Sequence, residues 1–163
     1  MVLKYSTTNA FVKTEGVNSG VLAYNVWKAL TDSPFYDKYA TIFDQVKINS
    51  IRVQINPYTT PTTNSYVLTA AFDRNGISDP TAGITETKIS SYSSARSIMV
   101  NFGSKNILYI NNFPVTRTEK EQYVPTSIVP NIAASLTDDA GNETSMVGSQ
   151  YWMYKPILLV SNK

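Results

Sequence analysis

Segment 45–57, with the sequence QVKINSIRVQINP, constrains the fold of this chain more than any other segment. Its aliphatic residues alternate with polar ones, which is the period-two pattern of a β-strand with one buried face. The aliphatic residues form two sets of opposite parity, Val46 and Ile48 in the first and Ile51, Val53 and Ile55 in the second. A single strand buries both sets only if a β-bulge at Asn49 and Ser50 shifts its phase by one residue. The alternative is two short strands joined by a kink, and in either case Pro57 ends the strand because it has no backbone N–H.

The rest of the sequence is also typical of β structure. Short apolar segments rich in Val, Ile, Thr and Tyr alternate with turn residues at intervals that suit a sandwich or barrel. Besides segment 45–57, the predicted strands are 2–13, 20–30, 65–73, 96–102, 106–113, 127–137 and 150–161. The other predicted elements are a helical turn within 34–44, a short helix within 84–92, a solvated loop at 117–121 and a turn at 138–143. The sequence therefore predicts an all-β fold, an antiparallel sandwich of about eight strands with long loops, in a single domain spanning residues 1–163.

Composition excludes several kinds of chemistry. The chain has 0 Cys and 0 His, so it cannot form a disulfide, a Cys/His zinc site or a Ser-His-Asp triad. No apolar run approaches the length of a membrane span, and the first residues have no apolar signal region. The 14 Lys and Arg are balanced by 12 Asp and Glu, without the basic stripe of a dedicated nucleic-acid binder. We therefore expect a protein that is not an enzyme, has no metal or cofactor and does not bind membranes.

Two groups of carboxylates are weighed as candidate sites. The oxygen-bearing side chains that could bind calcium are Asp138, Asp139, Asn142 and Glu143. They lack the EF-hand spacing, and acidic residues beside Gly are common in turns. Glu119 and Glu121, or Asp138 and Asp139, could be proposed as the paired carboxylates of a glycosidase, but such pairs must face each other across a cleft. Neighbours in one polar loop do not, so ordinary solvation is the favoured interpretation.

Aromatic and basic residues give two further candidates. Trp27 and Trp152 could form a sugar-stacking platform with the Tyr residues, although core packing and subunit contacts are the commoner roles of aromatics. Lys47 and Arg52 would share the solvent-facing side of one bulged strand. The alternative for this pair is a plain solvated sheet face.

Several segments together resemble the capsid proteins of circoviruses and related small circular single-stranded DNA viruses. Residues 43–57, FDQVKINSIRVQINP, resemble a family strand in which an aromatic leads into alternating basic and aliphatic residues and ends at a proline. YSSAR at 92–96, followed by Phe102 and by NNFP at 111–114, matches a second stretch in the same order. The opening strand, the Trp27 strand and the closing YWMYKPILLV segment also fall where the family has its own.

The resemblance implies a structural virion protein. It implies an eight-stranded jelly roll of two four-stranded sheets that self-assembles into a small icosahedral shell around a circular single-stranded DNA genome, with assembly in the host nucleus. Family members carry an arginine-rich amino-terminal arm that binds DNA and directs nuclear entry, whereas this chain begins at its first predicted strand. Lys47 and Arg52 match basic positions of the family strand, but Asn49 and Ser50 stand where basic residues are often found.

The expected partners are accordingly other copies of this chain and, weakly, genomic single-stranded DNA. The predicted nucleic-acid contacts are Lys4, Lys47 and Arg52. The alternative function is a carbohydrate-binding or adhesion β-sandwich module, which predicts a monomer with affinity for a glycan. A glycosidase is the second alternative, and the lack of His and of facing carboxylates disfavours it.

Overall fold

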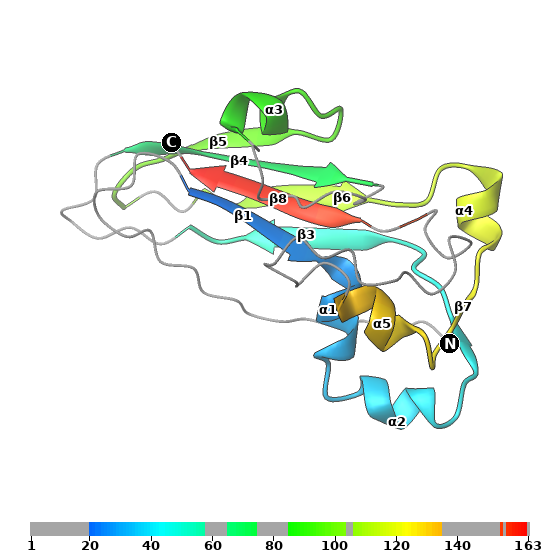
Figure 1. Cartoon of the computed structure of the whole chain (residues 1–163). Helices are drawn as coiled ribbons and strands as arrows, with labels where there is room; N and C mark the ends of the chain where they lie inside the picture. The colour runs from blue at the N-terminus through cyan, green and yellow to red at the C-terminus, as the bar shows by residue number, and fades with distance from the viewer. Residues whose placement is uncertain are drawn as a thin grey trace.

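The computed structural model describes residues 20–57, 65–74, 85–103, 106–134, 154 and 156–162, which form eight strands in antiparallel sheets and five short helices (Figure 1). The strands are β1 (Gly20–Asn25), β2 (Gln45–Val46), β3 (Ile51–Ile55), β4 (Tyr66–Asp73), β5 (Arg96–Val100), β6 (Leu108–Asn112), β7 (Val124–Pro125) and β8 (Ile157–Asn162). The helices are α1 (Val26–Thr31), α2 (Tyr36–Ala40), α3 (Glu86–Ser90), α4 (Arg117–Glu121) and α5 (Val129–Ala134). Of these helices, none is long and apolar enough to cross a membrane. The described part of the chain is thus mostly β, as the sequence predicts.

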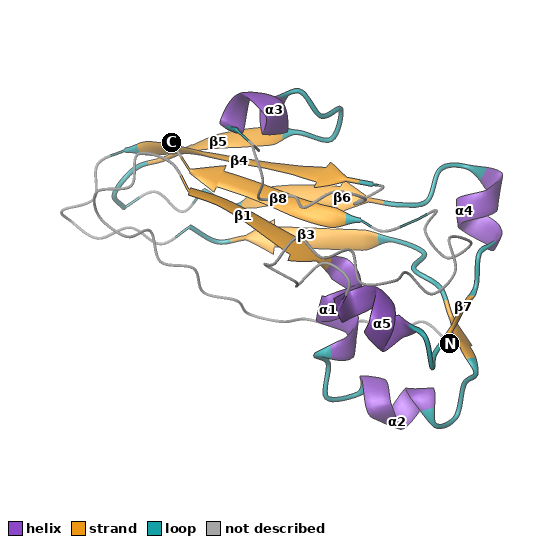
Figure 2. Ribbon diagram, in the orientation of Figure 1, coloured by secondary structure: helices purple, strands orange, loops and turns teal. Residues whose placement is uncertain are grey.

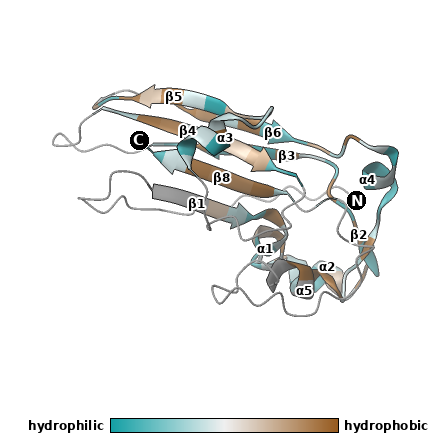
Figure 3. Ribbon diagram, turned by 45° about the horizontal axis from the view of Figure 1, so that its top comes forward, coloured by the Kyte–Doolittle hydropathy of each residue, from teal (hydrophilic) through white to brown (hydrophobic). Residues whose placement is uncertain are grey.

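The largest sheet has four strands in the order β1-β8-β4-β5. β8 lies inside this sheet, and its run ILLV is buried throughout because the sheet is covered on both faces. Leu159 of β8 lies opposite Ala23 of β1 and Ala71 of β4, so small neighbours make room for its side chain. A continuous apolar run is the pattern expected of a fully buried strand. Figure 3 shows the same property as brown ribbon along most of β8.

The pair β3–β6 forms a second layer against one face of this sheet (Figure 2). Alternate residues of both strands point inward, with burial alternating along β6 from Leu108 to Asn112. The resulting core cluster joins the two layers and contains Ile55, Leu68, Ala70, Phe72, Val100, Leu108, Ile110, Leu158 and Val160. The two layers therefore make a sandwich, held mainly by burial of aliphatic side chains and Phe72.

Strand pairing follows a nested pattern. β1 pairs with β8, β2 with β7, β3 with β6 and β4 with β5, all antiparallel. Each pair lies inside the preceding one along the chain, as the two arms of one long hairpin would. The further pairing of β4 with β8 joins the innermost pair, β4–β5, to the outermost pair, β1–β8, in one four-stranded sheet.

Helix α3 covers the other face of the four-stranded sheet. Thr85 begins the helix as its N-cap, because its side chain accepts a hydrogen bond from the Lys88 backbone N–H. Ile89 is then fully buried against Ala71, Ile157 and Leu159 of the sheet. This confirms the short helix predicted within 84–92.

Helices α1, α2 and α5 gather at one end of the sandwich and enclose a second core (Figure 1). Trp27 is 2% exposed at its centre, and its indole N–H donates to the Tyr154 carbonyl oxygen at 3.1 Å. The other buried members of this cluster are Tyr36, Val124, Val129 and Ile132. Trp27 therefore packs in a core and does not form a surface platform.

Two predicted strands are wrong in part or in whole. The strand predicted over 20–30 ends at Asn25, whose side chain accepts a hydrogen bond from the Trp27 backbone N–H at 2.9 Å and so begins α1. The strand predicted over 127–137 is wrong, because this segment contains the helix α5. Pro130 lies in the first turn of α5, where a missing N–H is tolerated.

The predicted bulge at 49–50 is also wrong, and the alternative of two short strands is correct. β2 and β3 pair with different partners, β7 and β6. The two parity sets enter different cores: Val46 and Ile48 pack in the Trp27 cluster, and Ile51, Val53 and Ile55 pack in the sandwich. The one-residue shift in the alternation therefore marks the point where the chain passes from the Trp27 cluster to the sandwich core, and it is not a bulge within one pair of strands.

The strands predicted at 65–73, 96–102 and 106–113 are confirmed, as is the helical turn within 34–44, and β3 ends before Pro57 as predicted. The segment predicted at 150–161 forms β8 from Ile157 onward. The predicted strand 2–13, the turn 138–143 and Trp152 lie outside the described residues.

Gly103, in the turn between β5 and β6, has a φ of +78°, which side chains with a Cβ rarely adopt. A Cβ there would meet nothing within 4 Å, so the cost of Gly103→Ala is backbone strain alone. We expect a loss of about 1–2 kcal/mol in the free energy of unfolding, measured by urea denaturation. Gly103→Asn should lose less stability than Gly103→Ala, because Asn tolerates a positive φ better than Ala does. Equal losses in the two variants would contradict a backbone origin.

Candidate nucleic-acid and subunit interfaces

The outer face of the β3–β6 pair carries a row of exposed polar and aromatic side chains, named here the outer ladder. Its members are Arg52, Gln54, Tyr109, Asn111 and Phe113. The alternation that buries Ile51, Val53 and Ile55 turns the intervening residues of β3 outward. Across the two strands, Arg52 lies opposite Asn111 and Gln54 opposite Tyr109. Tyr109 is 62% exposed and Phe113 is 58% exposed, so both rings are open to solvent.

The guanidinium of Arg52 makes no hydrogen bond or ion pair with any residue in the described ranges. The other arginines described do: Arg74 pairs with Glu119, Arg117 with Glu121, and Arg96 donates to a backbone carbonyl. Arg52 is thus available to an anionic partner.

Lys47 is in a different environment from Arg52. It follows β2, it is half-buried, and its Nζ lies 4.6 Å from the centroid of the Tyr123 ring. The same Nζ donates to the backbone carbonyl of Lys120 at 3.3 Å. The prediction that Lys47 and Arg52 share the face of one strand is therefore wrong, because β2 and β3 are separate strands. Lys4, the third predicted contact, lies outside the described residues.

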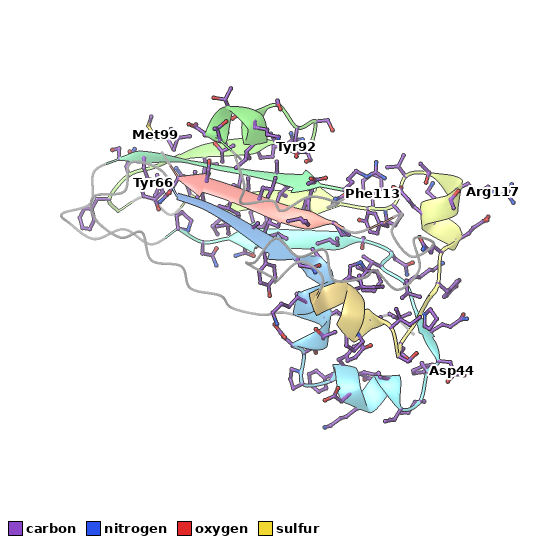
Figure 4. All side chains as sticks on the ribbon, viewed as in Figure 1. Asp44, Tyr66, Tyr92, Met99, Phe113 and Arg117 are labelled. Carbon is purple, nitrogen blue, oxygen red and sulfur yellow. The ribbon has the colours of Figure 1, made fainter. Side chains whose placement is uncertain are left out.

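Exposed apolar side chains gather on the helical end and around the β5–β6 and β6–α4 connections. Those of the described residues are Phe35, Ile42, Phe43, Met99, Phe102, Ile107, Tyr109, Phe113, Val115 and Tyr123. Figure 4 places Phe113 at the same end of the sandwich as Arg117 of α4, with Met99 and Tyr66 toward the opposite end. Scattered apolar residues are normal on a surface, but these ten large ones, most of them in the connections between elements, are candidate contact points.

The loop predicted at 117–121 is wrong, since these residues form α4. Thr116 and Glu119 make a capping box, in which the Thr116 side chain accepts from the Glu119 N–H and the Glu119 carboxylate accepts from the Thr116 N–H. Oε2 of Glu119 also accepts from the Val115 N–H at 2.8 Å and pairs with the Arg74 guanidinium. Burial raises the pKa of Glu119, but these hydrogen bonds and the Arg74 charge outweigh it and leave the pKa below its ordinary value.

Glu119 and Glu121 do not form a catalytic pair. Glu119 is 8% exposed and paired with Arg74, whereas Glu121 is exposed and pairs with Arg117 on the helix surface at 3.0 Å. Burial also raises the pKa of the Tyr154 hydroxyl, which lies near Arg74 and Glu119. In the part of the chain that the structure describes, no three acidic side chains are close enough together to hold a metal ion. The four oxygen-bearing residues at 138–143 lie outside that part.

Sequence reasoning singled out Arg52 but missed the aromatic members of the outer ladder. The signal was only partial, because Leu108 and Ile110 have the period-two spacing of one strand face, whereas Ile107 and Asn112 interrupt the alternation. Pairing that alternation with the one in β3 would have placed Tyr109 and Phe113 beside Arg52. The sequence does not show which strand pairs with which.

Neither a scan against models of known protein families nor a search of curated proteins finds a match to this chain.

Proposed function

We propose that this chain is the shell domain of a viral capsid protein, a jelly roll that self-assembles into a small icosahedral particle around a circular single-stranded DNA genome. The nested strand pairing is the observation that carries this proposal. A jelly roll is a long antiparallel hairpin rolled into two packed sheets, and it is a common architecture of capsid and lectin domains. The pairs β1–β8, β3–β6 and β4–β5, distributed over two layers, support that topology.

Exposed apolar side chains support assembly. Copies related by symmetry bury the same patches repeatedly, so a shell subunit needs several contact regions. Several of these side chains are suited to this, because Phe35, Ile42 and Phe43 flank α2 and Phe102 and Ile107 lie in the β5–β6 connection. Their burial between subunits would remove from water the surface that a monomer leaves exposed.

The DNA partner is proposed to bind weakly to this domain. Polyanion affinity grows with the number of phosphates neutralised, and a net charge of +2 provides few cations. Within the virion this domain would therefore serve mainly to form the protein shell. During assembly it would be found in the host nucleus.

Assembly is testable with the purified chain. Sedimentation at micromolar concentration and negative-stain electron microscopy should show closed particles. Ile42→Asp and Met99→Asp place charges at apolar side chains that are 69% and 59% exposed, and each should shift the protein toward slowly sedimenting species. The charge would be buried without a partner at a subunit contact.

The control is Thr118→Asp, which adds the same charge at an exposed polar position of α4 and should leave particles intact. A single species of 18.1 kDa across salt and pH would refute the proposal. So would particles that form equally well with aspartate at both apolar positions.

A further inference from the structure

We infer that the outer ladder binds single-stranded nucleic acid, with Tyr109 and Phe113 stacking on bases and Arg52 contacting a phosphate between them. This inference deepens the proposed function, on which it rests for the identity of the genome, and names a face that would hold the strand.

The arrangement of the two rings is the first argument. Tyr109 and Phe113 are four residues apart on one face of an extended chain, which separates their Cα atoms by about 13 Å. Both side chains are more than half exposed, at 62% and 58%, so a base can lie against either ring. Aromatic side chains spaced along an open sheet face are a common platform for unpaired bases, because every base has a stacking surface.

The position of Arg52 is the second argument. Its cross-strand partner is Asn111 of β6, which lies midway along the chain between Tyr109 and Phe113, the residue that follows β6. The Arg52 side chain therefore leaves the neighbouring strand at the level midway between the two aromatic residues. It has no ion-pair or hydrogen-bond partner among the described residues, so a phosphate would not have to displace one. The Asn111 amide, beside it, can add a hydrogen bond to a base or a sugar.

Charge complementarity is the third argument. Residues 47–57 and 106–116, which include both strands and their flanks, contain no Asp or Glu. The nucleic-acid backbone carries a negative charge on each nucleotide. On this face it would contact cations and neutral amides, without repulsion from carboxylates within these segments. A duplex would hide its base faces from the rings, so the ladder fits a single strand.

Fluorescence anisotropy with labelled oligothymidine, at a series of salt concentrations, tests the inference. Tyr109→Ala and Phe113→Ala should each weaken binding about 5- to 100-fold, which is the usual effect of losing one stacked base. Neither should change the slope of log affinity against log salt. Arg52→Ala should lower the magnitude of that slope by about one phosphate contact, whereas Arg52→Lys should retain it.

Matched controls separate stacking from general effects. Tyr109→Phe keeps the ring and should bind as the parent chain does. Phe35→Ala removes a ring of similar exposure, 53%, from the helical end and should leave affinity unchanged. A duplex of matching length should bind with little dependence on Tyr109. Circular dichroism melting of each variant checks that it is folded, as expected for exposed positions.

The outcomes distinguish this inference from the proposed function. Unchanged oligothymidine affinity in Tyr109→Ala and Phe113→Ala overturns the inference, even if particles form. Loss of particles in these variants with unchanged DNA affinity also overturns it, because the ladder would then be a contact between copies. Weakened DNA binding in a chain that never assembles would support the ladder while refuting the capsid.

Discussion

Replacement of Trp27 by alanine is expected to lower the free energy of unfolding by about 3–5 kcal/mol. Trp27 is almost fully buried at the centre of the cluster formed by α1, α2, α5 and β7. Its removal leaves a large cavity among Tyr36, Val124, Val129 and Ile132, and it also deprives the Tyr154 carbonyl of its 3.1 Å hydrogen bond. Urea denaturation of unassembled protein, followed by far-ultraviolet circular dichroism, measures the loss.

Trp27→Phe separates the two contributions. It keeps most of the apolar volume and removes the indole N–H. We therefore expect the free energy of unfolding to fall by about 1–3 kcal/mol, so that this variant is intermediate in stability between the parent chain and Trp27→Ala. The same pair tests the carbohydrate-binding alternative. A Trp27→Ala variant that is as stable as the parent chain but has lost affinity for a glycan would contradict the core role and favour the sugar platform.

Glu119→Gln is expected to destabilise the chain by about 2–3 kcal/mol at pH 7. The substitution keeps the shape of the side chain but removes the charge that pairs with Arg74 and accepts hydrogen bonds from the Val115 and Thr116 N–H groups. This loss of stability is smaller than that expected for a fully buried ion pair, because the Arg74 side chain is 35% exposed and water can partly solvate it.

The effect should depend on pH in a defined direction. The pKa of Glu119 is lowered in the folded chain, so the ionised carboxylate stabilises the fold above the pKa of an unfolded glutamate. That contribution is lost as the pH falls through the lower, folded-state pKa. Denaturation curves of the parent chain and Glu119→Gln should therefore differ most near neutral pH and converge in acid.

Glu121→Gln is the matched control for this prediction. It makes the same change two residues away on α4, where the pair with Arg117 is exposed to solvent on both sides. Surface pairs of this kind contribute little, so its stability should match that of the parent chain at every pH. If the difference in free energy of unfolding between Glu119→Gln and the parent chain persisted unchanged below pH 3, it could not arise from the Glu119 charge.

Local sequence patterns were enough to predict most strands. Alternation or continuous apolar runs predicted β4, β5, β6 and β8, and Pro57 predicted where β3 stops. These predictions succeed because period two and the missing N–H of proline act within a few residues. Helix α4 was also readable, since Thr116 and Glu119 have the spacing of a capping box ahead of a short helix, and it was missed because its charges were interpreted as a loop.

Tertiary structure decided the remaining features. The alternation of apolar residues within 45–57 indicates which side of the chain is buried, but it does not show which core that side packs against. One bulged strand and two strands in different cores therefore predict the same pattern. The mixed segment 127–137 is compatible with either a strand or a half-buried helix, and packing against Trp27 of α1 selects the helix α5.

The sequence by itself therefore determined a β-rich chain without cysteine or histidine chemistry, and it singled out Arg52 as a candidate cation. Only the tertiary structure decided that Arg52 lies opposite Asn111, level with the midpoint between Tyr109 and Phe113, while Lys47 lies apart against Tyr123. It likewise decided that Glu119 is buried beside Arg74. The physical reason is that these groupings join residues more than 40 positions apart in the sequence. Which strand pairs with which depends on burying all apolar faces at once, and no single segment contains that information.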